Sequence, residues 1–110
     1  MNTLISNNEE INDIVKTILN AVPAREIYIF GSFANGTANE DSDYDFYVVI
    51  PDDLQPIETT WKITGSISKE IKRKRSIDML VGTTSKFNKY KNALGFIEDE
   101  VIKTGVKLYG

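Results

Sequence analysis

The chain has 110 residues, of which 41% are hydrophobic and 26% are charged, and its formal net charge is −3. This length suits one ordinary domain, and we expect residues 1–110 to form a single one. The composition is that of a globular protein, neither disordered nor membrane-embedded, because the longest apolar run, Phe46–Ile50, is far shorter than a bilayer span of about 20 residues.

Two residue types that often carry catalysis are missing, since the chain has neither cysteine nor histidine. This excludes disulfides, thiolate metal sites, imidazole catalysis and histidine-ligated zinc, so acid–base or metal chemistry must come from carboxylates. The lack of cysteine and of a signal-peptide pattern fits the cytoplasm. A chain with more acidic than basic residues is also a poor general binder of nucleic acid.

The first half of the chain alternates between helical and strand patterns. Ser6 and Glu9 form a capping-box pattern that predicts the start of a helix, and Pro23 marks its end. Between them apolar residues recur on one helical face, at Ile11, Ile14, Val15, Ile18, Leu19 and Val22. We then expect a strand at Ile27–Phe30, a loop with one short helical turn at Gly31–Ser42, and a second strand at Tyr44–Ile50.

The second half continues the alternation. We expect a helix from Pro56 to about Lys74, with an inward face of Ile57, Trp61, Ile67 and Ile71. A third strand is expected at Ser76–Val81, a last helix near Asn88–Thr104 with Leu94, Ile97 and Val101 on one face, Gly105 as its C-cap, and a final strand at Val106–Tyr109. The order predicts an α/β (α+β) fold in which helices pack against a small mixed sheet of three to four strands.

Basic residues gather near the end of the second long helix, at Lys69, Lys72, Arg73, Lys74 and Arg75. We interpret the run as a solvated helix end, because positive charge suits the negative end of the helix dipole. Steering of phosphates and docking to an acidic partner are the alternative interpretations.

The acidic residues Asp43, Asp45 and Asp78 are the candidate metal ligands. Side chains alternate along a strand, so Asp43 and Asp45 should point the same way and converge on a hard cation such as Mg²⁺. A cation would also remove the repulsion between the two carboxylates. Asp78 lies among apolar residues, where an unpaired charge is costly. If its strand lies beside that of Asp45, the three carboxylates could hold the metal ions of a phosphoryl transfer.

Gly31 and Ser32 are the candidate nucleotide-binding residues. Glycine after a strand lets the backbone turn sharply, and a helix that begins at Ser32 would direct its amides toward an anion. The hydroxyl of Ser32 could add a hydrogen bond to a phosphate oxygen. An ordinary turn glycine and an ordinary helix cap are the alternative readings of these two residues.

The pattern Gly31-Ser32, ten residues, Asp43-Tyr44-Asp45, with Asp78 further on, resembles the signature of the DNA polymerase beta-like nucleotidyltransferase superfamily. The size and the closing helix and strand are similar to its minimal nucleotidyltransferase (MNT) branch. The resemblance implies a fold like the polymerase beta palm and transfer of AMP from ATP with magnesium. It also implies that all three aspartates ligate metal, and that Asp78 accepts the proton of the attacking hydroxyl.

The resemblance further implies a protein partner. MNT proteins of this size are similar to antitoxins whose toxin is a small helical HEPN protein (higher eukaryote and prokaryote nucleotide-binding), silenced by nucleotidylation, by tight binding, or by both. The expected reaction is therefore AMP transfer to a hydroxyl group on a HEPN-type toxin. The acceptor, the preferred base and the homo- or hetero-oligomeric state are left open by the sequence.

One departure from the family pattern keeps other functions open. The family often has arginine in an Ala-Arg-Gly-Thr stretch, but this chain has Ala34-Asn35-Gly36-Thr37, and asparagine cannot supply a cation to a phosphate. A non-catalytic module that occludes its partner is therefore one alternative. A small-molecule nucleotidyltransferase of the antibiotic-modifying kind is another, although the chain has no residues left for the helical domain that completes such acceptor pockets.

Overall fold

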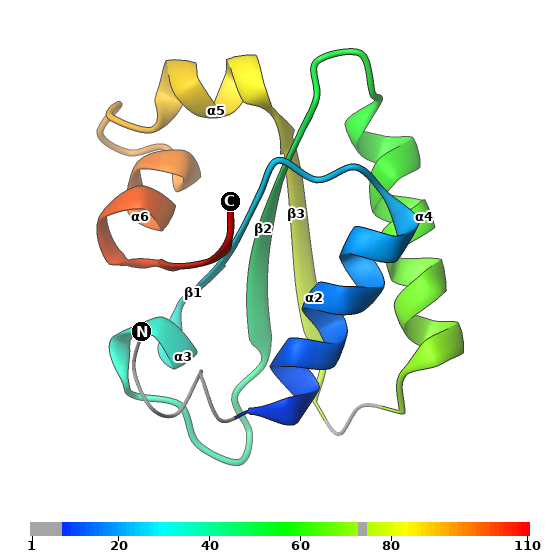
Figure 1. Ribbon diagram of the computed structural model, residues 1–110. Helices are drawn as coiled ribbons and strands as arrows, with labels where there is room; N and C mark the ends of the chain where they lie inside the picture. The colour runs from blue at the N-terminus through cyan, green and yellow to red at the C-terminus, as the bar shows by residue number, and fades with distance from the viewer. Residues whose placement is uncertain (1–7, 73–74) are drawn as a thin grey trace.

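A computed structural model of this protein describes residues 8–72 and 75–110 and shows a four-stranded sheet with helices on both faces (Figure 1). The sheet has the order β3-β2-β1-β4, in which β2 and β3 are parallel and β1 is antiparallel to both of its neighbours. The expected mixed α/β fold is confirmed. The elements are α2 (Glu9–Ala21), β1 (Glu26–Phe30), α3 (Ser32–Asn35), β2 (Tyr44–Ile50), α4 (Pro56–Glu70), β3 (Ile77–Thr83), α5 (Thr84–Tyr90), α6 (Ile97–Thr104) and β4 (Val106–Tyr109).

Helix α2 begins one residue after Asn8. The backbone N–H of Ile11 donates to Oδ1 of Asn8 over 2.9 Å, which makes Asn8 the N-cap of this helix. The expected cap, Ser6, lies outside the described residues. The predicted apolar face is confirmed, with Ile11, Ile14 and Ile18 fully buried. Throughout the described part of the chain, no helix is long and apolar enough to cross a membrane.

The two central strands bury side chains on both faces of the sheet. One face packs under α2 and α4, and its side chains from β1 and β2 are Ile27, Ile29, Tyr44, Phe46, Val48 and Ile50. The other face packs against α5 and α6, with Tyr28, Phe30, Tyr47 and Val49 around Phe87 and Val101. Figure 1 shows these two helix pairs on opposite sides of the sheet. Because side chains alternate along β2, Asp45 belongs to the α5–α6 side.

The predicted inward face of α4 was wrong in its first half. Ile57 and Trp61 are 67% and 70% exposed, whereas the buried row is Thr59, Ile63 and Ile67. Both rows have the four-residue spacing of a helical face, and the sheet packs against the second row. The helix also ends at Glu70 rather than near Lys74. Lys72 and Arg75 therefore lie in the connection to β3, whereas Arg73 and Lys74 of the expected basic helix end lie outside the described residues.

The single helix expected at Asn88–Thr104 is two helices, which corrects that prediction. Helix α5 begins earlier, where the hydroxyl of Thr83 accepts a hydrogen bond from Lys86 N over 3.2 Å. A turn then separates it from α6, and Gly95 in that turn has φ +93°. Leu94 consequently lies outside any helical face and is 89% exposed. Gly105 ends α6 as expected, and β4 follows at the predicted residues.

Candidate active site

The sheet brings two of the predicted acidic residues together where β2 and β3 begin. The parallel register of these strands pairs Asp45 directly with Asp78. On the other side of β2, Asp45 is opposite Phe30, the last residue of β1. The condition for a shared carboxylate site, that the strand of Asp78 lies beside the strand of Asp45, is therefore met. Asp43 lies one residue before β2 and is exposed, as is Asp78, whereas Asp45 is half-buried between β1 and β3.

Negative charge is concentrated around Asp45. Its partial burial, together with hydrogen bonding to the carboxylate of Asp78, raises the pKa of Asp45 from 3.8 to about 6. The charges of Asp43 and of Glu100, on α6, act on the pKa of Asp45 in the same direction. The site thus holds several carboxylates whose mutual repulsion a bound cation would relieve.

Gly31 forms the wall of this site on the β1 side. Its φ of +69° and ψ of −147° are a combination that side-chain-bearing residues rarely adopt. A β-carbon at this position would collide with Oδ2 of Asp45, so the carboxylate lies directly against the glycine backbone. The predicted turn and the predicted metal ligand are therefore parts of one site.

The short helix α3 starts at Ser32, immediately after this turn. Its first turn is closed by hydrogen bonds from Ala34 N and Asn35 N to the carbonyl oxygen of Gly31, each 3.1 Å long. Oδ1 of Asn35 accepts from both the amide and the hydroxyl of Thr37, at 3.2 and 2.6 Å. The side-chain oxygen of Asn35 therefore shapes the loop after α3.

The donor set suits a hard divalent cation, although the residues do not form a complete cage. Asp45 and Asp78 lie opposite each other on the paired strands β2 and β3, and carboxylate oxygens are the ligands that Mg²⁺ prefers. Within residues 8–72 and 75–110, however, no three acidic side chains converge on one point. Mg²⁺ commonly binds through one or two carboxylates plus substrate phosphates, so the paired residues Asp45 and Asp78 could begin such a site.

The chain's relationship to known proteins agrees with this geometry. Residues 9–110 match the family model described as polymerase beta, nucleotidyltransferase. The chain belongs to this family. No curated protein matches the sequence. The expected family and the expected enzyme class, a nucleotidyltransferase, are thereby confirmed.

Solved structures of toxin–antitoxin complexes have the same fold as this nucleotidyltransferase. A chain of one such complex, with AMP-PNP, is 25% identical in sequence to this chain. The TM-score is 0.65, and the match covers 94% of this chain and 74% of that chain. A chain in the complex of an MNT antitoxin with the tri-AMPylated HEPN toxin of Shewanella oneidensis is 21% identical to this chain. Its TM-score is 0.56, and the match covers 93% of this chain and 71% of that chain. The MntA–HepT complex is 22% identical, with a TM-score of 0.54 over 93% and 71%.

Sequence reasoning missed two residues on the α6 side of the candidate site in this nucleotidyltransferase. Tyr47 follows Asp45 on the same face of β2, and its hydroxyl donates to Oε2 of the buried Glu98 over 2.6 Å. Burial, followed by this bond, raises the pKa of Tyr47. This hydrogen bond links α6 to β2 at Tyr47, two residues after Asp45. The sequence signal for this hydrogen bond was a tyrosine on the same face of β2 as Asp45. Its partner Glu98 could not be inferred, because it lies 51 residues away.

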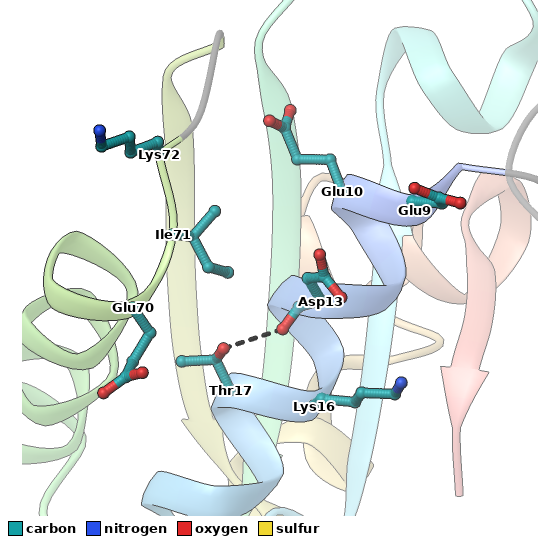
Figure 2. A pocket seen from close by; sticks show the side chains of 8 residues that line it. All are labelled: Glu9, Glu10, Asp13, Lys16, Thr17, Glu70, Ile71 and Lys72. Atoms are coloured by element: carbon teal, nitrogen blue, oxygen red, sulfur yellow. Dashed lines mark hydrogen bonds between the residues drawn. The ribbon is translucent and has the colours of Figure 1, made fainter.

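A surface hollow lies between the start of α2 and the end of α4 (Figure 2). Its acidic lining residues are Glu9, Glu10, Asp13 and Glu70, with Lys16 and Lys72 among them. The hollow belongs to the α2–α4 side of the sheet, whereas Asp45 and Asp78 face the α5–α6 side. It is therefore not part of the candidate active site.

Proposed function

We propose that this protein transfers AMP from ATP to a hydroxyl group of a HEPN-type partner in a magnesium-dependent reaction, and so acts as an antitoxin. The observation that carries the proposal is the position of Asp45, which lies against Gly31 on one side and Asp78 on the other. The AMP-PNP complex and the AMPylated HEPN complex among the similar structures support the donor and the acceptor class. In this proposal residues 1–110 act as one cytoplasmic nucleotidyltransferase domain.

Each site residue has a distinct task in the proposed reaction. Asp45 and Asp78 would hold Mg²⁺ together with Asp43, whose exposed side chain lies one residue before β2. The bound metal would neutralise charge on the transferring phosphoryl group. Gly31 lets phosphate approach the backbone closely, and Ser32 offers a hydroxyl donor. The exposed carboxylate of Asp78 would accept the proton of the attacking hydroxyl as its oxygen bonds to the α-phosphorus of ATP and pyrophosphate leaves.

A non-catalytic antitoxin that occludes its partner is the second candidate function. It is favoured by Asn35, which cannot replace the cation of the family arginine and whose Oδ1 bonds Thr37. It is also favoured by the exposed apolar residues Leu94, Phe96 and Ile97, because neighbouring exposed hydrophobic side chains often mark a protein interface.

Labelling of a partner distinguishes the two functions. The protein is incubated with Mg²⁺, α-labelled ATP and a candidate HEPN protein, beside Asp45→Asn, Asp78→Asn and the double variant Asp43→Ala/Asp45→Ala. Asp53→Asn is the matched control, because Asp53 is exposed in the turn after β2 and its change removes the same charge. We expect label on the HEPN protein with the wild type and with Asp53→Asn, and a loss of at least about 100-fold in the site variants.

Two results would contradict the transferase proposal. Label that persists in the double variant would mean that the carboxylate site is not responsible. A stable complex with the HEPN protein but no label with any form would instead support occlusion. Restoring arginine with Asn35→Arg would then show whether the missing cation explains the lack of transfer.

A further inference from the structure

Arg75, in the connection between α4 and β3, is bound to the loop that delivers Asp43. Its Nη1 donates to the carbonyl oxygen of Ser42, over 2.9 Å, and to that of Asn39. Arg75 is half-buried and lies beyond the end of α4, so the expected solvated helix end does not describe it. One guanidinium nitrogen thus joins two backbone carbonyls just before the first candidate metal ligand.

These two carbonyls belong to the ends of a small turn, Asn39–Ser42. The turn is closed internally, because Asp41 N donates to Oδ1 of Asn39 over 2.8 Å and Asn39 N donates to the hydroxyl of Ser42 over 2.9 Å. Ser42 N also donates to the carbonyl oxygen of Asn39 over 3.2 Å. The guanidinium therefore adds two hydrogen bonds to those within the turn and ties the turn to the residues just before β3.

The same guanidinium also packs on two aromatic rings. Its Cζ lies 5.0 Å from the centroid of Phe33 and 5.9 Å from that of Tyr44, which is within the range of cation–π attraction. Phe33 follows Ser32 in α3, and Tyr44 separates Asp43 from Asp45. Arg75 therefore contacts α3, which begins at Ser32, and β2, which carries Asp45. Arg75 itself lies three residues before Asp78.

The position of Arg75 on the α2–α4 side of the sheet argues against a direct role in binding phosphate. Phe33 and Tyr44 belong to the core under α2 and α4, whereas Asp45 faces the α5–α6 side. The side chain is also occupied by carbonyls and rings. Arg75 therefore does not substitute for the family arginine that Asn35 replaces.

We propose that Arg75 is a positioning residue, which holds the Asn39–Ser42 turn so that Asp43 can reach the metal site of Asp45 and Asp78. This inference deepens the proposed function and rests on it for the metal. The planar guanidinium donates from Nη1 to both carbonyls while it packs on two aromatic rings, and lysine has no planar group that could pack in this way. Residues that orient metal ligands typically affect metal affinity by 10-fold or more when changed, an order of magnitude that we expect here.

The test follows the turn and the metal separately in the full chain. Hydrogen exchange of the peptide that spans residues 39–44 reports on the turn, and the electron paramagnetic resonance of Mn²⁺ reports on metal binding. We expect Arg75→Met to speed the exchange and to weaken Mn²⁺ binding about tenfold, with Arg75→Lys between it and the wild type. Lys72→Met is the matched control, because it removes an exposed positive charge nearby without touching the turn.

The sign of the metal effect separates positioning from electrostatics. Loss of a positive charge near a cation site should strengthen Mn²⁺ binding, so weaker binding in Arg75→Met must come from geometry. Far-UV circular dichroism checks that each variant is folded, and Arg75→Lys carries the test if Arg75→Met is not.

Two outcomes would overturn the inference. One is wild-type exchange of the 39–44 peptide in the Arg75 variants. The other is wild-type Mn²⁺ affinity in those variants while Asp45→Asn abolishes binding. If the wild type binds no Mn²⁺ that depends on Asp45, the proposed metal site fails instead, and the exchange result alone decides whether Arg75 orders the turn.

Discussion

The carboxylate of Asp45 occupies the space that a β-carbon on Gly31 would take. This contact connects the end of β1 to the start of β2, and a side chain at position 31 would force the carboxylate of Asp45 to move. It also explains why a turn that ends one strand and a carboxylate on the next strand belong to one site. Pairing of Asp45 with Asp78 extends the same site to β3.

Gly31→Ala should therefore damage both stability and metal binding. The new methyl group meets Oδ2 of Asp45, and the backbone conformation is nearly restricted to glycine, so we expect a loss of about 2 kcal/mol or more. Gly36→Ala is the matched control, because Gly36 also has a positive φ, +81°, but open space around it. It should cost only about 1 kcal/mol. Equal urea midpoints and equal Mn²⁺ affinities for the two variants would contradict the role of the contact.

Asp45 should make the metal-free protein less stable as the pH rises. Its folded pKa of about 6 lies above the ordinary value of 3.8, so the folded state holds this proton more tightly than the unfolded state. The free energy of unfolding should thus fall between about pH 4 and pH 6, by about 1 kcal/mol once solvent screening is allowed for. Urea unfolding in EDTA across this range measures it. Asp45→Asn should abolish this contribution, Asp53→Asn should not, and an unchanged slope in Asp45→Asn would refute the assignment.

Most of the fold could be predicted because its strands follow simple patterns. The aromatic and β-branched residues at Tyr44–Ile50 predicted β2, and the alternation of side chains along a strand correctly placed Asp45 on the face opposite Tyr44 and Phe46. The two faces of α4 could not be distinguished in the same way, since Ile57 and Trp61 have the same spacing as the buried Thr59 and Ile63. Only the position of the sheet decides which row is buried.

The site was predictable in its parts but not in its arrangement. The residue types and spacing of Asp43, Asp45 and Asp78 indicated a metal site, and the parallel pairing of β2 with β3 brings two of them together. Contacts between residues distant in sequence left no local signal. The hydrogen bond from Arg75 to the carbonyl oxygen of Ser42, 33 residues away in sequence, is one such contact. The pair of Tyr47 and Glu98 is another.

Tyr47→Phe should destabilise the protein more than Tyr28→Phe. Tyr47 donates to the buried Glu98, whose other charged partner, Lys86, is 3.9 Å away, so the carboxylate would lose its close donor. We expect a loss of about 2 kcal/mol. Tyr28 donates to Glu26, which keeps Lys107 at 2.8 Å, so Tyr28→Phe should cost less than about 1 kcal/mol. Urea unfolding compares the two variants. An equal loss of stability would mean that the hydrogen bond from Tyr47 to Glu98 contributes no more than the one from Tyr28 to Glu26.

Gly65→Ala should stabilise the protein. Gly65 lies within α4 on its exposed surface, and a β-carbon there would meet no atom within 4 Å. Alanine lowers the entropy of the unfolded chain and suits a helix better, so the free energy of unfolding should rise by about 0.5 to 1 kcal/mol. Gly82→Ala is the contrasting variant, because its β-carbon would collide with the hydroxyl of Tyr47 and should destabilise the protein. Thermal unfolding measures both, and a lower melting temperature for Gly65→Ala would show that the helix needs glycine for a contact outside this chain or for a bend.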